Sequence, residues 1–287
     1  MGRTYLLFSL EYEMSHIQGK KDLYERGRMK LMIDLHCHIL PGIDDGAQTV
    51  TDSLVMAQKA IEEGIHTIVA TPHHQNGKYI NERTSIIHQV KQLNDELQQH
   101  NIPLTILPGQ EVRLYGDILE DYEADKIVTL NETNKYIFIE FPSNHVPRYA
   151  EQLFYELRVK GMIPIIVHPE RNAELIERPD TLYNLVNKGA LTQVTAGCLL
   201  GKFGKKIKKF SLQLVEHNLT HMIASDAHNT TSRGFHLAES YELIEKEFGM
   251  NVMSDLKENP YLLISGKAIY KEDPEQIRRK NCSVSFK

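Results

Sequence analysis

The amino-acid sequence predicts an α/β fold, a barrel of seven strand–helix units in a (β/α)7 arrangement. Seven short apolar runs are rich in Ile, Val and Leu and too short to be helices, as is typical of parallel strands buried on both faces. They cover residues 32–35, 67–70, 104–107, 136–139, 163–167, 191–194 and 222–224. Longer amphipathic segments separate these runs, which favours parallel strands joined by crossover helices. A doubly wound open sheet is the alternative.

The segments between the apolar runs have the periodicity of helices. Residues 50–63 place Leu54, Ala57 and Ile61 along one helical face, and Gly64 follows as a suitable C-cap. The other expected helices cover residues 86–100, 149–160, 181–188, 210–218 and 236–248.

Length and composition indicate one domain that is not embedded in a membrane. Residues 32–287 are long enough to share one core. Residues 1–31 carry mixed charge without periodicity, so we interpret them as an N-terminal extension or an expression leader. No apolar run approaches the ~20 residues that span a bilayer. The three cysteines are widely spaced, which predicts a reducing, cytoplasmic location. The net charge of -5 argues against nucleic acid as a main partner.

Six of the seven predicted strands end in residue types that bind metal ions. In chain order these candidates are His36, His38, Asp45 in the loop that follows, His73, Glu111, Glu140, His168, Asp226 and His228. In a parallel barrel the C-terminal ends of all strands meet on one face, where such enzymes form their active sites. A single histidine at a strand end is more often structural, but six coincident strand ends favour a metal centre.

The spacing of the candidates indicates how they could share ions. His36 and His38 are two residues apart and project from one face of a strand, and Asp226 and His228 repeat this spacing. Mixed imidazole and carboxylate ligands suit Zn, Mn or Fe better than Ca, and about nine ligands imply two or three ions. Glu111 is a natural bridging carboxylate.

Several nearby residues are expected to have other roles. Asp34 is expected to orient a histidine or cap a turn. One of Asp44 and Asp45 is expected to shape the loop, and His74 to point away from the site. The basic stretch at residues 202–209 is interpreted as a solvated helix face.

Other catalytic classes fit the sequence less well. A cysteine-based phosphatase needs an arginine six positions after its nucleophile, but Ile43 and Gly204 stand six positions after Cys37 and Cys198. The sequence contains no Gly-rich dinucleotide fingerprint after the first strand, no P-loop and no Gly-x-Ser-x-Gly elbow.

A series of motifs carries a family resemblance. Asp-x-His-x-His (34–38), Thr-Pro-His (71–73), a strand-end Glu, His-Pro-Glu-Arg (168–171) and Ser-Asp-Ala-His (225–228) occur in this order. Together they resemble the polymerase-and-histidinol-phosphatase (PHP) superfamily, and residues 32–46 are similar to its CpsB/CapC-type bacterial tyrosine phosphatases. The resemblance implies a distorted (β/α)7 PHP barrel with three divalent ions at the C-terminal ends of the strands. It implies Mn as the usual metal, with Fe or Zn as alternatives.

The resemblance also implies a role for each site residue. One ion would be held by His36, His38, Glu111 and Asp226, a second by Glu111, Glu140 and His168, and a third by Asp45, His73 and His228. Arg171 and Arg233 match the phosphate-binding arginines of the family, and with Asp226 they are the residues expected to be catalytic.

The activity implied is that of a metal-dependent protein-tyrosine phosphatase. The resemblance implies phosphotyrosine proteins as partners, namely bacterial tyrosine kinases and their substrates, and a link to exopolysaccharide or capsule regulation. From the residues themselves, we expect a hydroxide that bridges two cations to attack phosphorus. A phosphoesterase for a histidinol-phosphate-like small molecule or for nucleic acid is the alternative, and a non-catalytic metal-binding regulator is a third reading.

Overall fold

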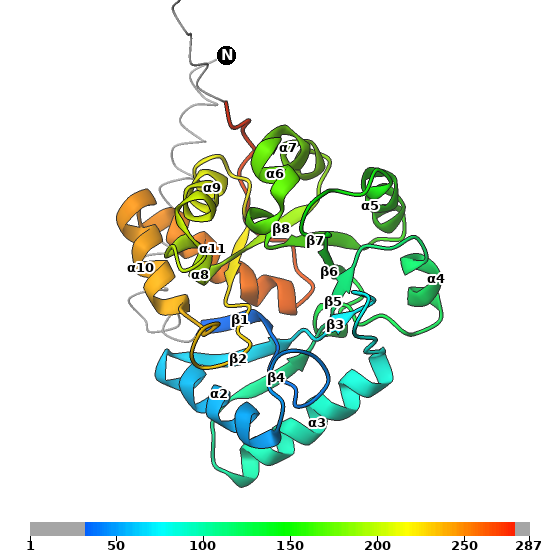
Figure 1. The fold of residues 1–287 in the computed structure, drawn as a ribbon, viewed down its shortest axis with the longest axis vertical. Coiled ribbons are helices and arrows are strands. Elements are labelled where there is room, and N and C mark those ends of the chain that lie inside the picture. The colour runs from blue at the N-terminus through cyan, green and yellow to red at the C-terminus, as the bar shows by residue number, and fades with distance from the viewer. Residues whose placement is uncertain (1–31, 279–287) are drawn as a thin grey trace, which may run out of the picture.

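The computed structural model describes residues 32–278, which form parallel strands surrounded by helices (Figure 1). Three strands pair in the order β1, β2 and β4, and six in the order β3, β5, β6, β7, β8 and β9. Every pairing is parallel. The strands are β1 (Met32–Cys37), β2 (Ile65–Ala70), β3 (His73–His74), β4 (Thr105–Pro108), β5 (Glu111–Arg113), β6 (Tyr136–Glu140), β7 (Ile163–Val167), β8 (Leu191–Thr195) and β9 (Met222–Ala224).

The two sheets are parts of one distorted barrel. Only residues 71–72 separate β2 from β3, and only residues 109–110 separate β4 from β5, so each pair is one strand with an interruption. The far edges meet where Cys37 bridges Ala227 in parallel. Two further backbone hydrogen bonds join this seam, from Asp226 N to the His36 carbonyl (2.8 Å) and from His38 N to the Ala227 carbonyl (2.9 Å). The strands therefore follow one another in sequence order around a closed ring, which confirms the predicted α/β barrel over the open-sheet alternative.

Ten α-helices and two 3-10 turns lie outside the strands in the described part of the chain. They are α2 (Val50–Glu62), α3 (Arg83–Gln99), α4 (Ile118–Glu123), η1 (Leu130–Glu132), α5 (Ala150–Val159), η2 (Pro169–Arg171), α6 (Ala173–Glu177), α7 (Pro179–Asn187), α8 (Ala196–Leu199), α9 (Lys205–Glu216), α10 (Leu237–Phe248) and α11 (Met250–Ile264). All six helices expected from periodicity are present, with ends shifted by up to five residues, since α9 begins at Lys205 rather than at residue 210. None of the helices within residues 32–278 has the length and hydropathy needed to cross a bilayer.

Two apolar clusters hold the barrel together. The inner cluster contains side chains of the strands, such as Ile33, Phe138 and Ile165, and Leu263 of α11 joins it. The outer cluster packs the strands against the surrounding helices. The pairing of β1 with β2 shifts register between Asp34 and Cys37, as at a β-bulge. Cys37 joins the outer cluster, whereas the His36 ring lies 5.6 Å from that of Phe138 in the inner one.

The helix α11 was not expected. Its buried side includes polar residues, Ser254 and Asn259, and Pro260 lies inside it, so its sequence has no clean apolar stripe. The Asn259 side chain donates hydrogen bonds to the carbonyls of His221 and Tyr270, which explains why an amide is buried there. The interpretation of residues 1–31 falls outside the described residues, and a single domain over residues 32–287 stays a prediction.

Candidate metal centre

The nine candidate ligands converge at the C-terminal ends of the strands. Their donor atoms form four overlapping clusters, and within each cluster these atoms lie within 4.8 Å of one another. The clusters are His38, Asp45, His73 and His228; His36, His38 and Asp226; His36, Glu111 and His168; and His73, Glu111 and Glu140. No other described residue belongs to such a cluster. Every sequence-derived candidate is thus brought to one place.

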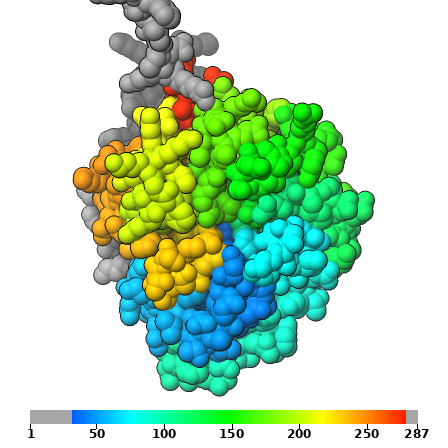
Figure 2. Space-filling model, in the orientation of Figure 1, coloured from blue at the N-terminus to red at the C-terminus, as the bar shows by residue number. Residues whose placement is uncertain are grey.

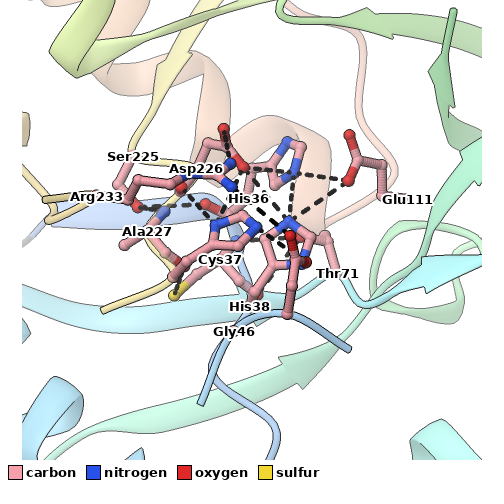
Figure 3. A network of polar contacts seen from close by, with 12 residues as sticks. His36, Cys37, His38, Gly46, Thr71, Glu111, Ser225, Asp226, Ala227 and Arg233 are labelled. Atoms are coloured by element: carbon pink, nitrogen blue, oxygen red, sulfur yellow. Dashed lines mark hydrogen bonds and ion pairs between the residues drawn. The ribbon is translucent and has the colours of Figure 1, made fainter. Parts of the chain in front are cut away.

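Four buried acceptor atoms face one another at the centre of the site. The Nε2 atoms of His36 and His38 lie 3.3 Å apart. Each is 3.4 to 3.5 Å from Glu111 Oε2 and from Asp226 Oδ1. Figure 3 shows these side chains pointing toward a common centre.

Hydrogen bonds on the outer side of the histidine rings set which nitrogen carries the proton. His36 Nδ1 lies 3.0 Å from the amide oxygen of Gln193, and His38 Nδ1 lies 2.7 Å from Asp44 Oδ2. An amide oxygen and a carboxylate oxygen can only accept hydrogen bonds, so both Nδ1 atoms donate. In the neutral rings both Nε2 atoms then carry lone pairs. Four electron-rich atoms at these separations repel one another unless a cation lies between them. The donor set therefore fits a divalent metal ion.

The remaining ligands surround Glu111 and Asp45. Glu111 Oε2 lies 2.7 Å from His73 Nδ1, and Glu111 Oε1 lies 2.6 Å from His168 Nε2. Asp45 Oδ1 lies 3.3 Å from His73 Nε2 and 3.4 Å from His228 Nε2. Glu111 thus has one oxygen toward each of two groups of ligands, as a bridging carboxylate would.

Glu140 stands at the edge of the site and is paired with a residue that sequence reasoning missed. Arg113 Nε donates to Glu140 Oε2 at 3.0 Å, and this oxygen lies 3.8 Å from His73 Nδ1. Burial and the Glu111 carboxylate raise the pKa of Glu140 to about 7, while Arg113 opposes that rise. The sequence did indicate that Arg113 faces the site, because Arg113 follows Glu111 by two residues and therefore lies on the same face of the strand. It did not indicate that Glu140 is the partner of Arg113.

Asp34 and His74 do not join the clusters. Asp34 is fully buried and accepts hydrogen bonds from the backbone N and the hydroxyl of Ser225, which tie β1 to the loop after β9. The His74 ring is also buried, and it lies 6.3 Å from the ring of Tyr115.

Two ligand-bearing turns have backbone conformations that L-residues rarely adopt. His168 has φ 35° and Asp226 has φ 53°. Such left-handed residues reverse the chain sharply at a strand end and are found where the surrounding structure enforces them, often at functional sites. Glu170 contributes to one of these turns, because its buried carboxylate accepts a hydrogen bond from Thr195 N at 2.8 Å.

Both candidate phosphate-binding arginines lie beside the metal ligands. Arg171 Nη1 and Arg233 Nη2 lie 2.7 and 2.9 Å from Asp226 Oδ2, the carboxylate oxygen that does not face the two histidines. Burial would raise the pKa of Asp226, but Arg171 and the other cations hold it well below its usual range. The Arg171 guanidinium also lies 5.8 Å from the centre of the Phe203 ring.

A cavity of about 270 Å³ opens over these groups. Its polar lining includes His73, Glu140, His168, Asp226 and both arginines. Its apolar lining comes from Phe141, Val167 and Pro169. Cationic forks beside a ring of metal-type ligands suit a phosphoryl group, and the apolar wall suits a flat hydrophobic substituent on it.

Several known proteins are similar to this chain in sequence and fold. Residues 32–265 match the family described as capsular polysaccharide synthesis, CpsB/CapC. The tyrosine-protein phosphatase YwqE of Bacillus subtilis (strain 168) is 53% identical over 249 residues, covering 87% of this chain and 98% of YwqE. The putative tyrosine-protein phosphatase CapC of Staphylococcus aureus is 38% identical over 245 residues, covering 85% of this chain and 96% of CapC.

A solved structure of this family is also similar to this chain in fold. It is described as one of YwqE from Bacillus subtilis and CpsB from Streptococcus pneumoniae, unique metal-dependent tyrosine phosphatases. It matches with a TM-score of 0.84 and 52% identity, covering 86% of this chain and 100% of that chain. The sequence and structural matches together show that this chain belongs to the CpsB/CapC family.

Proposed function

We propose that this chain is a metal-dependent protein-tyrosine phosphatase. The observation that carries the proposal is the convergence of nine metal-type ligands and two arginines on one cavity. Family membership supports it, because YwqE and CapC, which match nearly their whole length, are named as tyrosine-protein phosphatases, CapC as a putative one.

The nine ligands would hold three divalent cations, with Mn as the expected metal and Fe or Zn as alternatives. We assign His36, His38, Glu111 and Asp226 to the first ion, and Glu111, Glu140 and His168 to the second. Asp45, His73 and His228 would hold the third. Glu111 Oε2 lies 3.4 to 3.5 Å from Nε2 of His36 and His38, and Glu111 Oε1 lies 2.6 Å from His168 Nε2, which supports a bridge between the first and second ions. When bound, the cations would activate water toward hydroxide and neutralise phosphoryl oxygens.

The protein's own residues would bind and orient the phosphoryl group. Arg171 and Arg233 present planar donor forks that can bind phosphate oxygens in pairs, and Asp226 holds both forks in place. The Phe141 and Pro169 side chains would contact the tyrosine ring. Because a phenol has a pKa near 10, the leaving phenolate needs little protonation, and a dedicated general acid is unnecessary.

The finer biological assignment rests on family membership. We infer that the substrates are phosphotyrosine residues of bacterial tyrosine kinases and of their target proteins, and that dephosphorylation regulates exopolysaccharide or capsule synthesis. A cytoplasmic location suits this role and is supported by the free thiols of Cys37 and Cys198.

The proposal is tested by metal analysis and substrate choice on one preparation. Metal content is measured on freshly purified protein, which is then chelated and reloaded with Mn, Fe or Zn. Each form is assayed with a phosphotyrosine peptide, histidinol phosphate and an oligonucleotide. We expect about three ions per chain and a preference for the peptide, and we expect Asp226→Ala to abolish turnover.

Other outcomes would contradict specific parts of the proposal. Preference for histidinol phosphate or the oligonucleotide would show that the proposed substrate class is wrong, whereas metal-dependent phosphoester hydrolysis would still hold. Absence of phosphoester hydrolysis in every metal-loaded form would favour a regulatory role. Full activity of Asp226→Ala would show that this carboxylate is not needed for catalysis.

A further inference from the structure

A segment rich in lysine lies beside the phosphate-binding cavity. The lysine segment, residues 202–209, contains Lys202, Lys205, Lys206, Lys208 and Lys209, and all except Lys208 are exposed. None of the five side chains makes a hydrogen bond or a salt bridge to another residue of the described chain (32–278). Since the whole protein has a net charge of -5, this concentration of cations is local.

The position of these lysines in the fold is electrostatically unfavourable. Four of them belong to the first five residues of α9, and the first turn of this helix contains no acidic residue. The aligned peptide dipoles of a helix place positive charge at its N-terminus, so cations there repel the helix end and one another. A negatively charged partner would relieve this repulsion.

The lysine segment is joined directly to the proposed phosphate site. Phe203 lies within the segment, and its ring is 5.8 Å from the Arg171 guanidinium. α9 also packs against η2, the turn that carries Arg171. Figures 1 and 2 show α9, in yellow-green, at the surface between the green helices α6 and α7 and the orange helix α10.

We propose that the lysine segment binds acidic or phosphorylated side chains that flank the phosphotyrosine in the protein substrate. This inference rests on the proposed phosphatase function and specifies its substrate class. A peptide whose phosphoryl group lies against Arg171 continues outward past Phe203. Its next anionic residues then reach Lys205, Lys206 and Lys209, where long-range attraction raises the rate of productive encounter.

The test compares two triple variants of the full-length, metal-loaded protein. Lys205→Gln, Lys206→Gln and Lys209→Gln remove three charges from the segment while keeping residues of similar helix propensity. The matched control, Lys91→Gln, Lys267→Gln and Lys271→Gln, removes three exposed charges from α3 and from the chain after α11.

Three substrates separate docking from chemistry. They are a phosphotyrosine peptide with glutamates on both sides, the same peptide with glutamines, and p-nitrophenyl phosphate. We expect the wild-type protein and the control to prefer the acidic peptide about tenfold in kcat/KM at low salt, the size that three exposed ion pairs can supply. The segment variant should lose this preference, and 0.5 M salt should abolish it in every protein. Rates with p-nitrophenyl phosphate should be equal.

The outcomes distinguish this inference from the function on which it rests. Equal wild-type rates on the two peptides, or a preference retained by the segment variant, overturn the docking surface but leave the phosphatase function standing. Failure to hydrolyse either peptide overturns the proposed function as well. A last experiment measures binding of each protein to vesicles of phosphatidylglycerol and phosphatidylcholine. If the segment variant loses vesicle binding while its peptide preference is unchanged, the segment binds membranes and the substrate proposal is wrong.

Discussion

Asp44 Oδ2 lies 2.7 Å from Nδ1 of His38, and both side chains are buried. The carboxylate accepts the Nδ1 proton, which leaves Nε2 free to face the centre of the site. Asp44 also accepts hydrogen bonds from the backbone N of Gly46 at 2.9 Å and of His73 at 3.2 Å. Burial would raise the pKa of Asp44, but His38, the hydrogen bond from Gly46 N and the charge of His73 lower it. One carboxylate therefore orients a ligand and links the loop after β1 to β3.

Replacing this carboxylate should weaken metal binding without removing any ligand. In Asp44→Asn the charged partner of His38 is lost, and the amide can present either its oxygen or its nitrogen to the ring. Changes of this kind behind a metal ligand cost roughly 10- to 100-fold in metal affinity. Competition with a chelating dye measures the affinity, and Asp95→Asn on the exposed side of α3 is the control. Unchanged affinity in Asp44→Asn would contradict the orienting role.

Gly46 is expected to tolerate no side chain. A Cβ at this position would overlap the His38 carbonyl oxygen and lie 2.5 Å from the His38 Cβ. Because the backbone of a metal-ligand residue would have to move, Gly46→Ala should lower stability by ~1–3 kcal/mol or more and reduce the bound metal. Gly116→Ala is the matched control, since nothing lies within 4 Å of its added methyl. Chemical denaturation and metal analysis of both variants measure stability and metal content. Equal stability and equal metal content in the two variants would show that the loop around Gly46 can adapt to a side chain.

Arg171 should contribute to phosphate binding through its fork geometry. Arg171→Ala is expected to raise KM for a phosphotyrosine peptide and the inhibition constant for inorganic phosphate by at least about tenfold, since a charged hydrogen bond is worth ~1.5–3 kcal/mol. Arg171→Lys keeps the charge but loses the paired donors, so it should recover only part of the loss. Steady-state kinetics with phosphate as inhibitor provides the measurement. Full recovery by lysine would show that charge alone matters at this position.

Removal of the cations should destabilise the fold. The facing acceptor atoms of His36, His38, Glu111 and Asp226 would then repel one another. At a free metal concentration of 100 times Kd, binding contributes about 2.7 kcal/mol, which corresponds to a Tm difference of at least ~5 °C for a protein of this size. Calorimetry before and after chelation measures the difference, and Asp226→Ala should show a smaller one. A Tm that does not respond to chelation would argue against cations at this site.

A buried histidine that belongs to none of the ligand clusters predicts a pH dependence of stability. Burial and Lys271 lower the pKa of His221 to about 3, and its Nδ1 accepts a hydrogen bond from Thr192 N at 3.1 Å. The unfolded chain takes up a proton near pH 6.5, so this group stabilises the fold fully above that pH and less at each step down toward pH 3.

The test compares the unfolding free energy of the wild-type protein and of His221→Gln at two pH values. Between pH 7.5 and pH 5.5 the wild-type protein should lose about 1 kcal/mol more of its unfolding free energy than His221→Gln does, since the slope is at most about 1.4 kcal/mol per pH unit. Effects of pH on the metal ligands are shared by both proteins and cancel. Parallel pH profiles would show that His221 does not titrate on unfolding.

The sequence predicted the barrel and the place of the site because both depend on local patterns. Apolar runs buried on both faces mark the strands, and in a parallel barrel a ligand at the end of any strand must reach the same face. The helix α11 escaped prediction because its buried side contains Ser254 and Asn259, whose partners lie on other segments.

Contacts that depend on distant pairing could not be read from spacing. Gln193 fixes the ring of His36 across 157 positions of the chain, and Asp34 reaches Ser225 across 191. Arg113 pairs with Glu140 on the neighbouring strand, which requires knowing that β5 and β6 are adjacent. The type of each residue was visible in the sequence, but the identity of its partner came only from the closed ring of strands.

The seam between β1 and the loop after β9 has a consequence for how the protein matures. His36 and His38 come from one side of this seam, and Asp226 and His228 from the other. His36 and Asp226 are 190 positions apart in a chain of 287 residues, so during synthesis the second pair of ligands emerges from the ribosome long after the first. A nascent chain that ends before β9 has the first histidines but lacks Asp226 and His228, so cation capture should be among the last steps of biogenesis. Radioactive Mn bound by nascent chains stalled before and after residue 228, with enough following chain to clear the ribosome, would reveal that order.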